Sequence, residues 1–144
     1  MADYLFFNES EAAAMSMTDI SSVKNAQEAA GSIATHYNAA VIVTLGERGA
    51  LLAKGGVGWM ADGYPVSVKD TQGAGDTFMG VFAAGLIFGM DPEQALLRAN
   101  VAAALSVSRM GSAQHSYPDT AVTEEITNKL LRENVIARFN YRQS

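Results

Sequence analysis

The segment with the clearest chemistry is residues 73–76, where Gly73, Ala74 and Gly75 are followed by Asp76. It lies between a polar stretch and an apolar one, so we expect it to begin a helix. Small residues at a helix N-terminus leave backbone N–H groups accessible at the positive end of the helix dipole. Such groups bind phosphate and other anions, and residues 73–75 are therefore predicted to form an anion hole.

Asp76 is expected in the first turn of that helix, where a negative charge is favoured. A carboxylate beside an anion hole can take the proton of a hydroxyl group while the hydroxyl oxygen attacks a phosphoryl group. No Lys-Ser or Lys-Thr follows Gly75, so the segment is not a P-loop. Taken alone, an aspartate after two glycines is more often a simple helix cap than a catalytic residue. Other motifs in the chain are needed to distinguish these two roles.

The residues before this segment predict an α/β sheet. Residues 4–7 are aromatic or branched and predict a strand, and the polar residues after them predict a loop that leads into a helix. Apolar spacings of three and four predict a second helix over residues 23–37, capped by Ser21 or Ser22. Residues 40–45 are typical of a strand covered on both faces. A strand, helix, strand order favours parallel pairing.

Residues 46–67 have a different pattern, in which short apolar pieces are separated by Gly55-Gly56 and Asp62-Gly63. These dipeptides are hairpin signals, so we expect an antiparallel edge of the sheet here. The remaining apolar periodicity predicts three helices, over residues 74–88, 91–110 and 123–134. No repeat and no linker divides the chain, which is long enough for one domain or for half of a larger one.

Composition excludes several classes of protein. Hydrophobic residues make up 49% of the 144 residues, the net charge is −5 and there is no cysteine. These values indicate a globular chain without disulfides or thiolate zinc sites, and the cytoplasm is the expected compartment. The sequence has no stripe of basic residues of the kind that binds the phosphates of a nucleic acid, so we do not expect a nucleic-acid-binding protein. We also expect no membrane association, because no apolar run reaches the roughly 20 residues of a spanning helix and no signal peptide is visible.

Three motifs in order point to one family. Residues 70–76, Asp-Thr-Gln-Gly-Ala-Gly-Asp, resemble the signature of the ribokinase-type carbohydrate kinases, the PfkB family. Residues 8–11, Asn-Glu-Ser-Glu, are similar to its N-x-x-E motif, and residues 44–49, Thr-Leu-Gly-Glu-Arg-Gly, to its T-L-G-x-x-G loop. Residues 100–118 resemble the stretch that flanks the adenine. The resemblance runs from about residue 4 to residue 118.

The resemblance implies a role for each matching residue. Asp76 would be the catalytic base, with Gly73, Ala74 and Gly75 as the anion hole, which are the roles that the residues themselves predict. Asn8 and Glu11 would organise magnesium and the nucleotide phosphates through water, with Glu11 as the metal residue. Five residues would contact the nucleotide: Asn8, Thr44, Gly46, Gly49 and Asn100. Helix capping remains an alternative for Asn8 and Glu11, and a solvent-facing position remains one for Asn100.

The resemblance also implies a potassium ion near Asp70. The backbone at Gln72 and Gly111 would complete that site, together with Ser116. The segment around Ser116 is one residue longer than the commonest family pattern.

The implied fold is a ribokinase-like three-layer α/β sandwich with a mainly parallel sheet and an antiparallel edge at residues 46–67. The motifs belong to the C-terminal half of the family's chain. We therefore expect residues 1–144 to be its nucleotide-binding and catalytic part, with the N-terminal sugar-binding and lid part absent. The implied activity is ATP-dependent phosphotransfer to a hydroxyl of a sugar or sugar-like substrate. The alternative is a non-catalytic nucleotide-binding or interaction fragment. A divided sheet would expose an edge and apolar surface, which predicts either a homodimer or an unstable chain.

Overall fold

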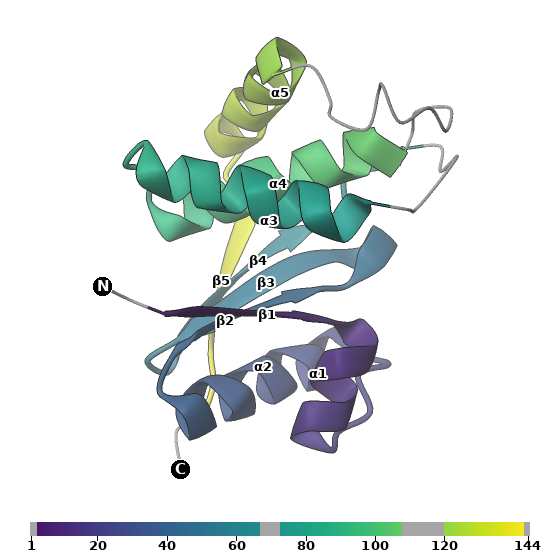
Figure 1. Cartoon of the computed structure of the whole chain (residues 1–144), viewed down its shortest axis with the longest axis vertical. Helices are drawn as coiled ribbons and strands as arrows, with labels where there is room; N and C mark the ends of the chain where they lie inside the picture. The colour runs from purple at the N-terminus through teal and green to yellow at the C-terminus, as the bar shows by residue number, and fades with distance from the viewer. Residues whose placement is uncertain (1–2, 67–72, 108–119, 143–144) are drawn as a thin grey trace. The chain divides into compact units, whose positions relative to one another are not determined.

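The computed structural model describes residues 3–66, 73–107 and 120–142 of the chain (Figure 1). The chain divides into two compact units. Unit 1 comprises Met1–Met60 and Ala137–Ser144, and unit 2 comprises Ala61–Ile136. Each unit is described separately below. Over the described ranges, no helix is both long enough and apolar enough to span a bilayer.

A five-stranded sheet, most of it in unit 1, has the strand order β1-β2-β3-β4-β5. The strands are β1 (Tyr4–Asn8), β2 (Ala40–Thr44), β3 (Gly49–Lys54), β4 (Val57–Asp62) and β5 (Ile136–Asn140). β1 and β2 pair in parallel, whereas β2 and β3 pair antiparallel. The sheet is therefore mixed rather than mainly parallel, because β2 and β3 pair antiparallel and the neighbouring strands β3 and β4 are joined by a two-residue hairpin turn.

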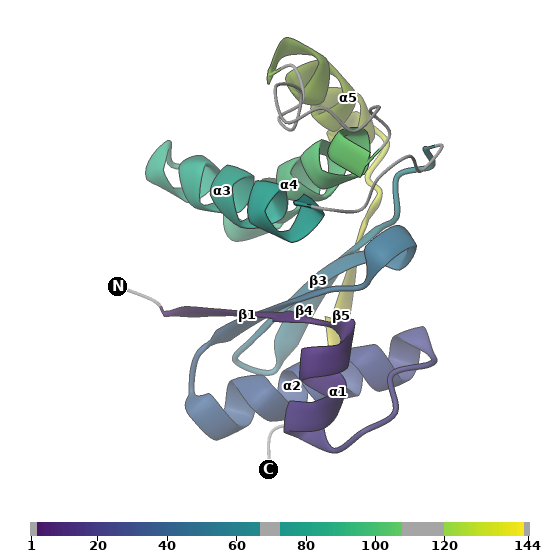
Figure 2. The same ribbon diagram turned by 45° about the vertical axis from the view of Figure 1, so that its right-hand side comes forward.

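Helices α1 (Glu9–Ser16) and α2 (Val23–Tyr37) lie together on one side of the sheet (Figures 1 and 2). Alternate residues of β2 and β3 meet them, with Val41 opposite Ala53 and Val43 opposite Leu51. These side chains share a buried cluster with Ile33 and the small residues of both helices. Burial of each large aliphatic side chain contributes about 1.5–3 kcal/mol. The cluster thereby holds the start of α1 beside the ends of β1 and β2.

Local signals explain the start of α2 and the turn between β3 and β4. The Ser22 hydroxyl accepts a hydrogen bond from the Asn25 N–H at 3.1 Å, which confirms one of the two predicted caps. Gly55 and Gly56 have φ of +61° and +89°, as a two-residue type I′ turn requires, and the predicted β3–β4 hairpin forms there.

Two predictions for the segments next to the strands are wrong. β1 passes straight into α1 without the predicted loop, because Asn8 caps the helix. Asp62-Gly63 forms no hairpin, and residues 63–66 form no strand. Pro65 explains the second error, since proline cannot donate a hydrogen bond to a strand ladder.

Unit 2 contains α3 (Ala74–Ile87), α4 (Pro92–Val107) and α5 (Thr120–Arg132). Phe78 and Phe82 of α3 are buried and stacked, with ring centroids 6.5 Å apart. A Cβ atom at Gly85 would lie 3.1 Å from the Cβ atom of Ala95, so α3 and α4 approach closely there. The predicted helices over 74–88 and from 91 are confirmed, and α5 begins three residues before its predicted start at 123.

Candidate active site

Unit 1 brings two of the sequence motifs together. Asn8 ends β1, Thr44 ends β2, and the two residues are register partners in the parallel pair. In α/β sheets, ligands bind beyond the carboxyl ends of parallel strands. The N-x-x-E and T-L-G-x-x-G motifs therefore meet where such a sheet places its ligand.

Asn8 and Glu11 form a capping box at the start of α1. The Glu11 N–H donates to Asn8 Oδ1 at 2.8 Å, and the Asn8 N–H donates to Glu11 Oε1 at 2.9 Å. The capping alternative from the sequence is thus confirmed for both residues. Glu11 remains exposed, and in the described ranges its hydrogen bond to Asn8 involves only one carboxylate oxygen. A second oxygen on an exposed carboxylate suits a hydrated magnesium ion.

The magnesium fit depends on water and phosphate ligands. Among the described residues, no group of three or more His, Asp or Glu side chains could hold a metal ion. Magnesium usually keeps several water ligands and binds one or two carboxylates together with substrate phosphates. One exposed carboxylate beside a nucleotide is compatible with that chemistry.

The loop after β2 is a 3-10 turn, η1 (Gly46–Arg48), that depends on two glycines. Gly46 has φ of +59° and Gly49 has φ of +106°, which L side chains rarely adopt. The Leu45 N–H donates to the Gly49 carbonyl at 2.8 Å and closes the loop. A Cβ atom at Gly46 would meet nothing within 4 Å, so the backbone there is open to a ligand.

Unit 2 carries the predicted anion hole at the N-terminus of α3. Gly73 is the N-cap residue, with φ of +83° and no side-chain cap, and the Thr77 N–H donates to its carbonyl at 2.9 Å. Ala74, Gly75 and Asp76 are the first three helical residues, whose N–H groups have no partner within the helix. A Cβ atom at Gly73 or Gly75 would meet nothing within 4 Å. Packing does not explain Gly75, whereas close approach of a ligand would.

Asp76 is the third residue of α3 and is exposed. The cap position belongs to Gly73, so the explanation of Asp76 as a simple N-cap is wrong. The carboxylate therefore lies on the same helical turn as the open N–H groups. This arrangement can bind an anion and accept a proton next to it.

Asn100 is only 7% exposed, so its solvent-facing alternative is also wrong. Its Nδ2 donates to the Asp62 carbonyl at 2.8 Å, and both residues belong to unit 2. The side chain fastens α4 to the end of β4. Contact of Asn100 with a nucleotide stays a prediction.

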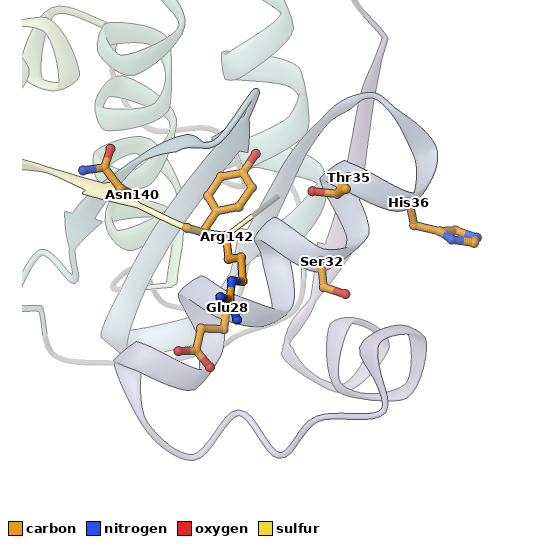
Figure 3. Close-up of a pocket in the computed structure, with 7 residues that line it drawn as sticks. Glu28, Ser32, Thr35, His36, Asn140 and Arg142 are labelled. Carbon is orange, nitrogen blue, oxygen red and sulfur yellow. The ribbon is translucent and has the colours of Figure 1, made fainter. Parts of the chain in front are cut away.

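A cavity of about 610 Å³ in unit 1 lies between α2 and the end of β5 with the two residues after it (Figure 3). Its lining residues are Glu28, Ser32, Thr35, His36, Asn140, Tyr141 and Arg142. Burial raises the pKa of the Tyr141 hydroxyl in this cavity. Burial has the same effect on the pKa of Tyr4, which lies in β1 and does not line the cavity. None of the predicted site residues lines this cavity, so it is separate from the motifs above.

The sequence pattern did not predict one ion pair that lies beside the two motifs of unit 1. Glu9 and Arg48 occupy the variable positions of the two motifs in unit 1 and form an ion pair. In the sequence, only the opposite charges of these two residues indicated that they could form an ion pair.

The predicted potassium site lies outside the described residues. This holds for Asp70 and Ser116, and also for Gln72 and Gly111.

Comparisons with known proteins agree on one group. A family model described as "pfkB family carbohydrate kinase" matches residues 1–120. The chain is similar to the ribokinase of Bacillus subtilis (strain 168), with 41% identity over 90 residues. Its structure is similar to that of Arabidopsis thaliana ribokinase complexed with ribose and ATP, with a TM-score of 0.75 and 29% identity. For Thermotoga maritima ribokinase the TM-score is 0.74 and the identity 35%.

These similarities confirm the predicted ribokinase-like α/β fold. They cover most of this chain but less than half of each relative. The match covers 62% of this chain and 30% of the Bacillus protein. The corresponding shares are 87% and 40% for the Arabidopsis structure, and 88% and 42% for the Thermotoga structure.

Proposed function

Because the chain belongs to the pfkB family of carbohydrate kinases, we propose that it serves ATP-dependent transfer of a phosphoryl group to a hydroxyl of a sugar or sugar-like substrate. The observation that carries this proposal is the N-terminus of α3. Gly73 and Gly75 leave the backbone there open, and Asp76 is exposed one residue further on. One similar structure also supports the proposal, because the Arabidopsis ribokinase structure is a complex with ribose and ATP.

In this proposal, the backbone at Gly73, Ala74 and Gly75 binds the phosphoryl group that is transferred. Negative charge on its oxygens is stabilised by N–H groups that already point outward from the helix terminus. Asp76 accepts the proton of the acceptor hydroxyl as the new oxygen–phosphorus bond forms. The bond from phosphorus to the ADP oxygen breaks in the same step, so atoms and charge balance.

The nucleotide contacts are also part of the proposal. The Thr44 hydroxyl and the backbone at Gly46 and Gly49 would contact phosphates, Asn8 would lie beside them, and Asn100 would face the adenine or ribose. Glu11 would hold magnesium through water, and the metal would neutralise phosphate charge. We also propose a potassium ion at Asp70 and, because the chain lacks cysteine, a cytoplasmic location.

A second candidate is a nucleotide-binding or interaction fragment without catalysis. It is favoured by the coverage, because the chain spans only 30–42% of the length of the three relatives. Transfer requires the acceptor oxygen to be held about 3 to 3.5 Å from phosphorus. We therefore expect the 144-residue chain to bind ATP and ADP weakly and to phosphorylate sugars little.

Calorimetry with a matched pair of variants tests the anion hole. Gly75→Ala and Gly80→Ala both add one methyl group to α3 where a Cβ atom meets nothing within 4 Å. Gly75→Ala should weaken ATP binding about tenfold, equivalent to one lost hydrogen bond to a charged group, and ADP binding less. Gly80→Ala should change neither affinity. Equal effects of the two variants, or no nucleotide binding by the unmodified chain, would contradict the proposal.

An ADP-release assay over a panel of sugars and nucleosides then separates the two candidates. Magnesium-dependent turnover on any acceptor would support the enzyme. Nucleotide binding without turnover would support the fragment.

A further inference from the structure

Arg48 connects three separate segments of unit 1. Its Nη2 lies 3.0 Å from Glu9 Oε1 and donates to the Ile20 carbonyl at 2.9 Å, and its Nη1 donates to the Ser21 carbonyl at 3.2 Å. The guanidinium thus joins η1 to the start of α1 and to the chain between α1 and α2. The rigid fork of an arginine can serve several acceptors at once, which the single ammonium group of a lysine does less well.

The positions of the two charged residues matter more than the strength of the ion pair. Glu9 lies between Asn8 and Glu11, and Arg48 lies between Gly46 and Gly49. The ion pair therefore connects the segment proposed to organise magnesium with the segment proposed to contact the nucleotide. The β1–β2 register places Asn8 beside Thr44, and the β2–β3 pairing holds the two ends of η1. The Arg48 contacts join the turn itself to the start of α1 and to the chain after it.

Burial shows what kind of effect to expect. The side chain of Arg48 is 30% exposed and that of Glu9 is 50% exposed. Ion pairs with this much exposure contribute little to folding, because water screens them and two long side chains lose freedom. A contact of this type can still select one loop arrangement among several of similar free energy.

We propose that Arg48 and Glu9 are a positioning pair that holds η1 at a set distance from the Asn8–Glu11 capping box. The pair touches neither substrate nor metal and acts through the groups on either side of it. This inference rests on the proposed function for its consequence, which is that magnesium and nucleotide strengthen each other's binding. Without the pair, each ligand still binds, but their mutual strengthening declines.

The first test needs no ligand. Amide hydrogen exchange is measured by NMR. The N–H groups of Asn8 and Glu11 report on the capping box. The N–H groups of Leu45 and Gly49 report on the loop. Glu9→Gln should raise exchange in both groups by about two- to fivefold, as expected for loss of an exposed ion pair. Arg48→Met should do the same. Faster exchange in only one of the groups would overturn the inference.

The second test measures ADP affinity by calorimetry with and without magnesium. Each variant should reduce the gain in affinity that magnesium provides by about two- to fivefold, and should change affinity in the absence of magnesium less. Glu9→Gln combined with Arg48→Met should resemble Arg48→Met alone, because the contact that Glu9→Gln weakens is already absent from that variant. Additive losses would contradict a shared role.

Glu28→Gln and Lys54→Met are matched controls. Both residues are exposed in unit 1, and in the ranges that the structure describes neither takes part in an ion pair. They should leave both readouts unchanged. If the unmodified chain binds no ADP, the proposed function fails, and the exchange experiment alone still decides whether the pair couples the two segments.

Discussion

At the N-terminus of α3, Asp76 is the one carboxylate on the same turn as the open backbone of Gly73 and Gly75. The prediction applies to a kinase assay in which the unmodified protein shows turnover. There, Asp76→Asn should reduce kcat by about 10²- to 10⁴-fold, because general-base catalysis is lost. Nucleotide affinity should hardly change. The measurement is steady-state kinetics together with calorimetry. Glu93→Gln, which removes the first-turn carboxylate of α4, is the control.

Turnover of Asp76→Asn equal to that of the unmodified protein would remove the assignment of the base. A loss of nucleotide affinity with unchanged kcat would instead make Asp76 a binding residue.

Glu11 combines a structural and a proposed metal role, and two substitutions separate them. Glu11→Gln keeps an oxygen that can accept from the Asn8 N–H, so thermal stability should stay nearly unchanged. It should raise the magnesium concentration needed for half-maximal nucleotide binding, because the charge is lost. Glu11→Ala should also reduce the free energy of unfolding by about 1 kcal/mol through loss of the capping box.

Circular dichroism melting and a magnesium titration provide the two readouts. If Glu11→Gln leaves the magnesium dependence unchanged and Glu11→Ala still destabilises, Glu11 serves only the helix.

At the scale of elements, β5 and the residue after it are held by aromatic rings that sit on glycines. A Cβ atom at Gly31 of α2 would overlap the Tyr141 ring, and one at Gly58 of β4 would overlap the far end of the Phe139 ring. Both rings pack against the core of unit 1, and the Tyr141 N–H donates to the Gly56 carbonyl at 3.0 Å. The two glycines leave the space in which the rings lie.

Alanine at these glycines should therefore destabilise unit 1. Gly31→Ala should reduce the free energy of unfolding by about 1–3 kcal/mol, because the clash reaches the Cβ and Cγ atoms of Tyr141, which cannot swing away easily. Gly58→Ala should cost less, since only the ring tip of Phe139 must move. Urea unfolding measures both.

Gly80→Ala in α3 provides the control for a helical glycine with open space around it. It should stabilise by about 0.5–1 kcal/mol, as alanine usually does in a helix. A similar gain for Gly31→Ala would show that Tyr141 does not pack there in solution.

At the scale of the whole molecule, two surface features favour self-association. β1 ends the strand order of the described sheet, and Ile87 and Phe88 are 82% and 80% exposed. Apolar side chains this exposed and adjacent often mark contact surfaces. We predict a reversible homodimer, which sedimentation velocity at several concentrations would detect.

Ile87→Lys combined with Phe88→Lys should weaken this dimer at least about tenfold, because charged side chains would have to be desolvated. Met17→Lys, at an apolar residue that is 93% exposed elsewhere in the chain, should not. Sedimentation as a monomer at all concentrations would contradict the prediction.

The sequence by itself determined the features that depend on neighbouring residues. The cap of α2 at one of two adjacent serines, the Gly55-Gly56 hairpin and the helix start after Gly73 each follow from hydrogen bonds and backbone preferences within a few residues. The Asn8–Glu11 capping box is local for the same reason, and its spacing already suggested it. Such features need no knowledge of what packs around them.

Only the tertiary structure decided the features that join distant residues. β5 has just five residues with a weak alternation, and it is a strand because β4 offers a free edge far away in the sequence. Asn100 is buried because Asp62 presents a carbonyl to it, and Arg48 meets Glu9 because β1 and β2 lie side by side. Each of these contacts requires that the chain already be packed, and residue type alone does not specify the partner.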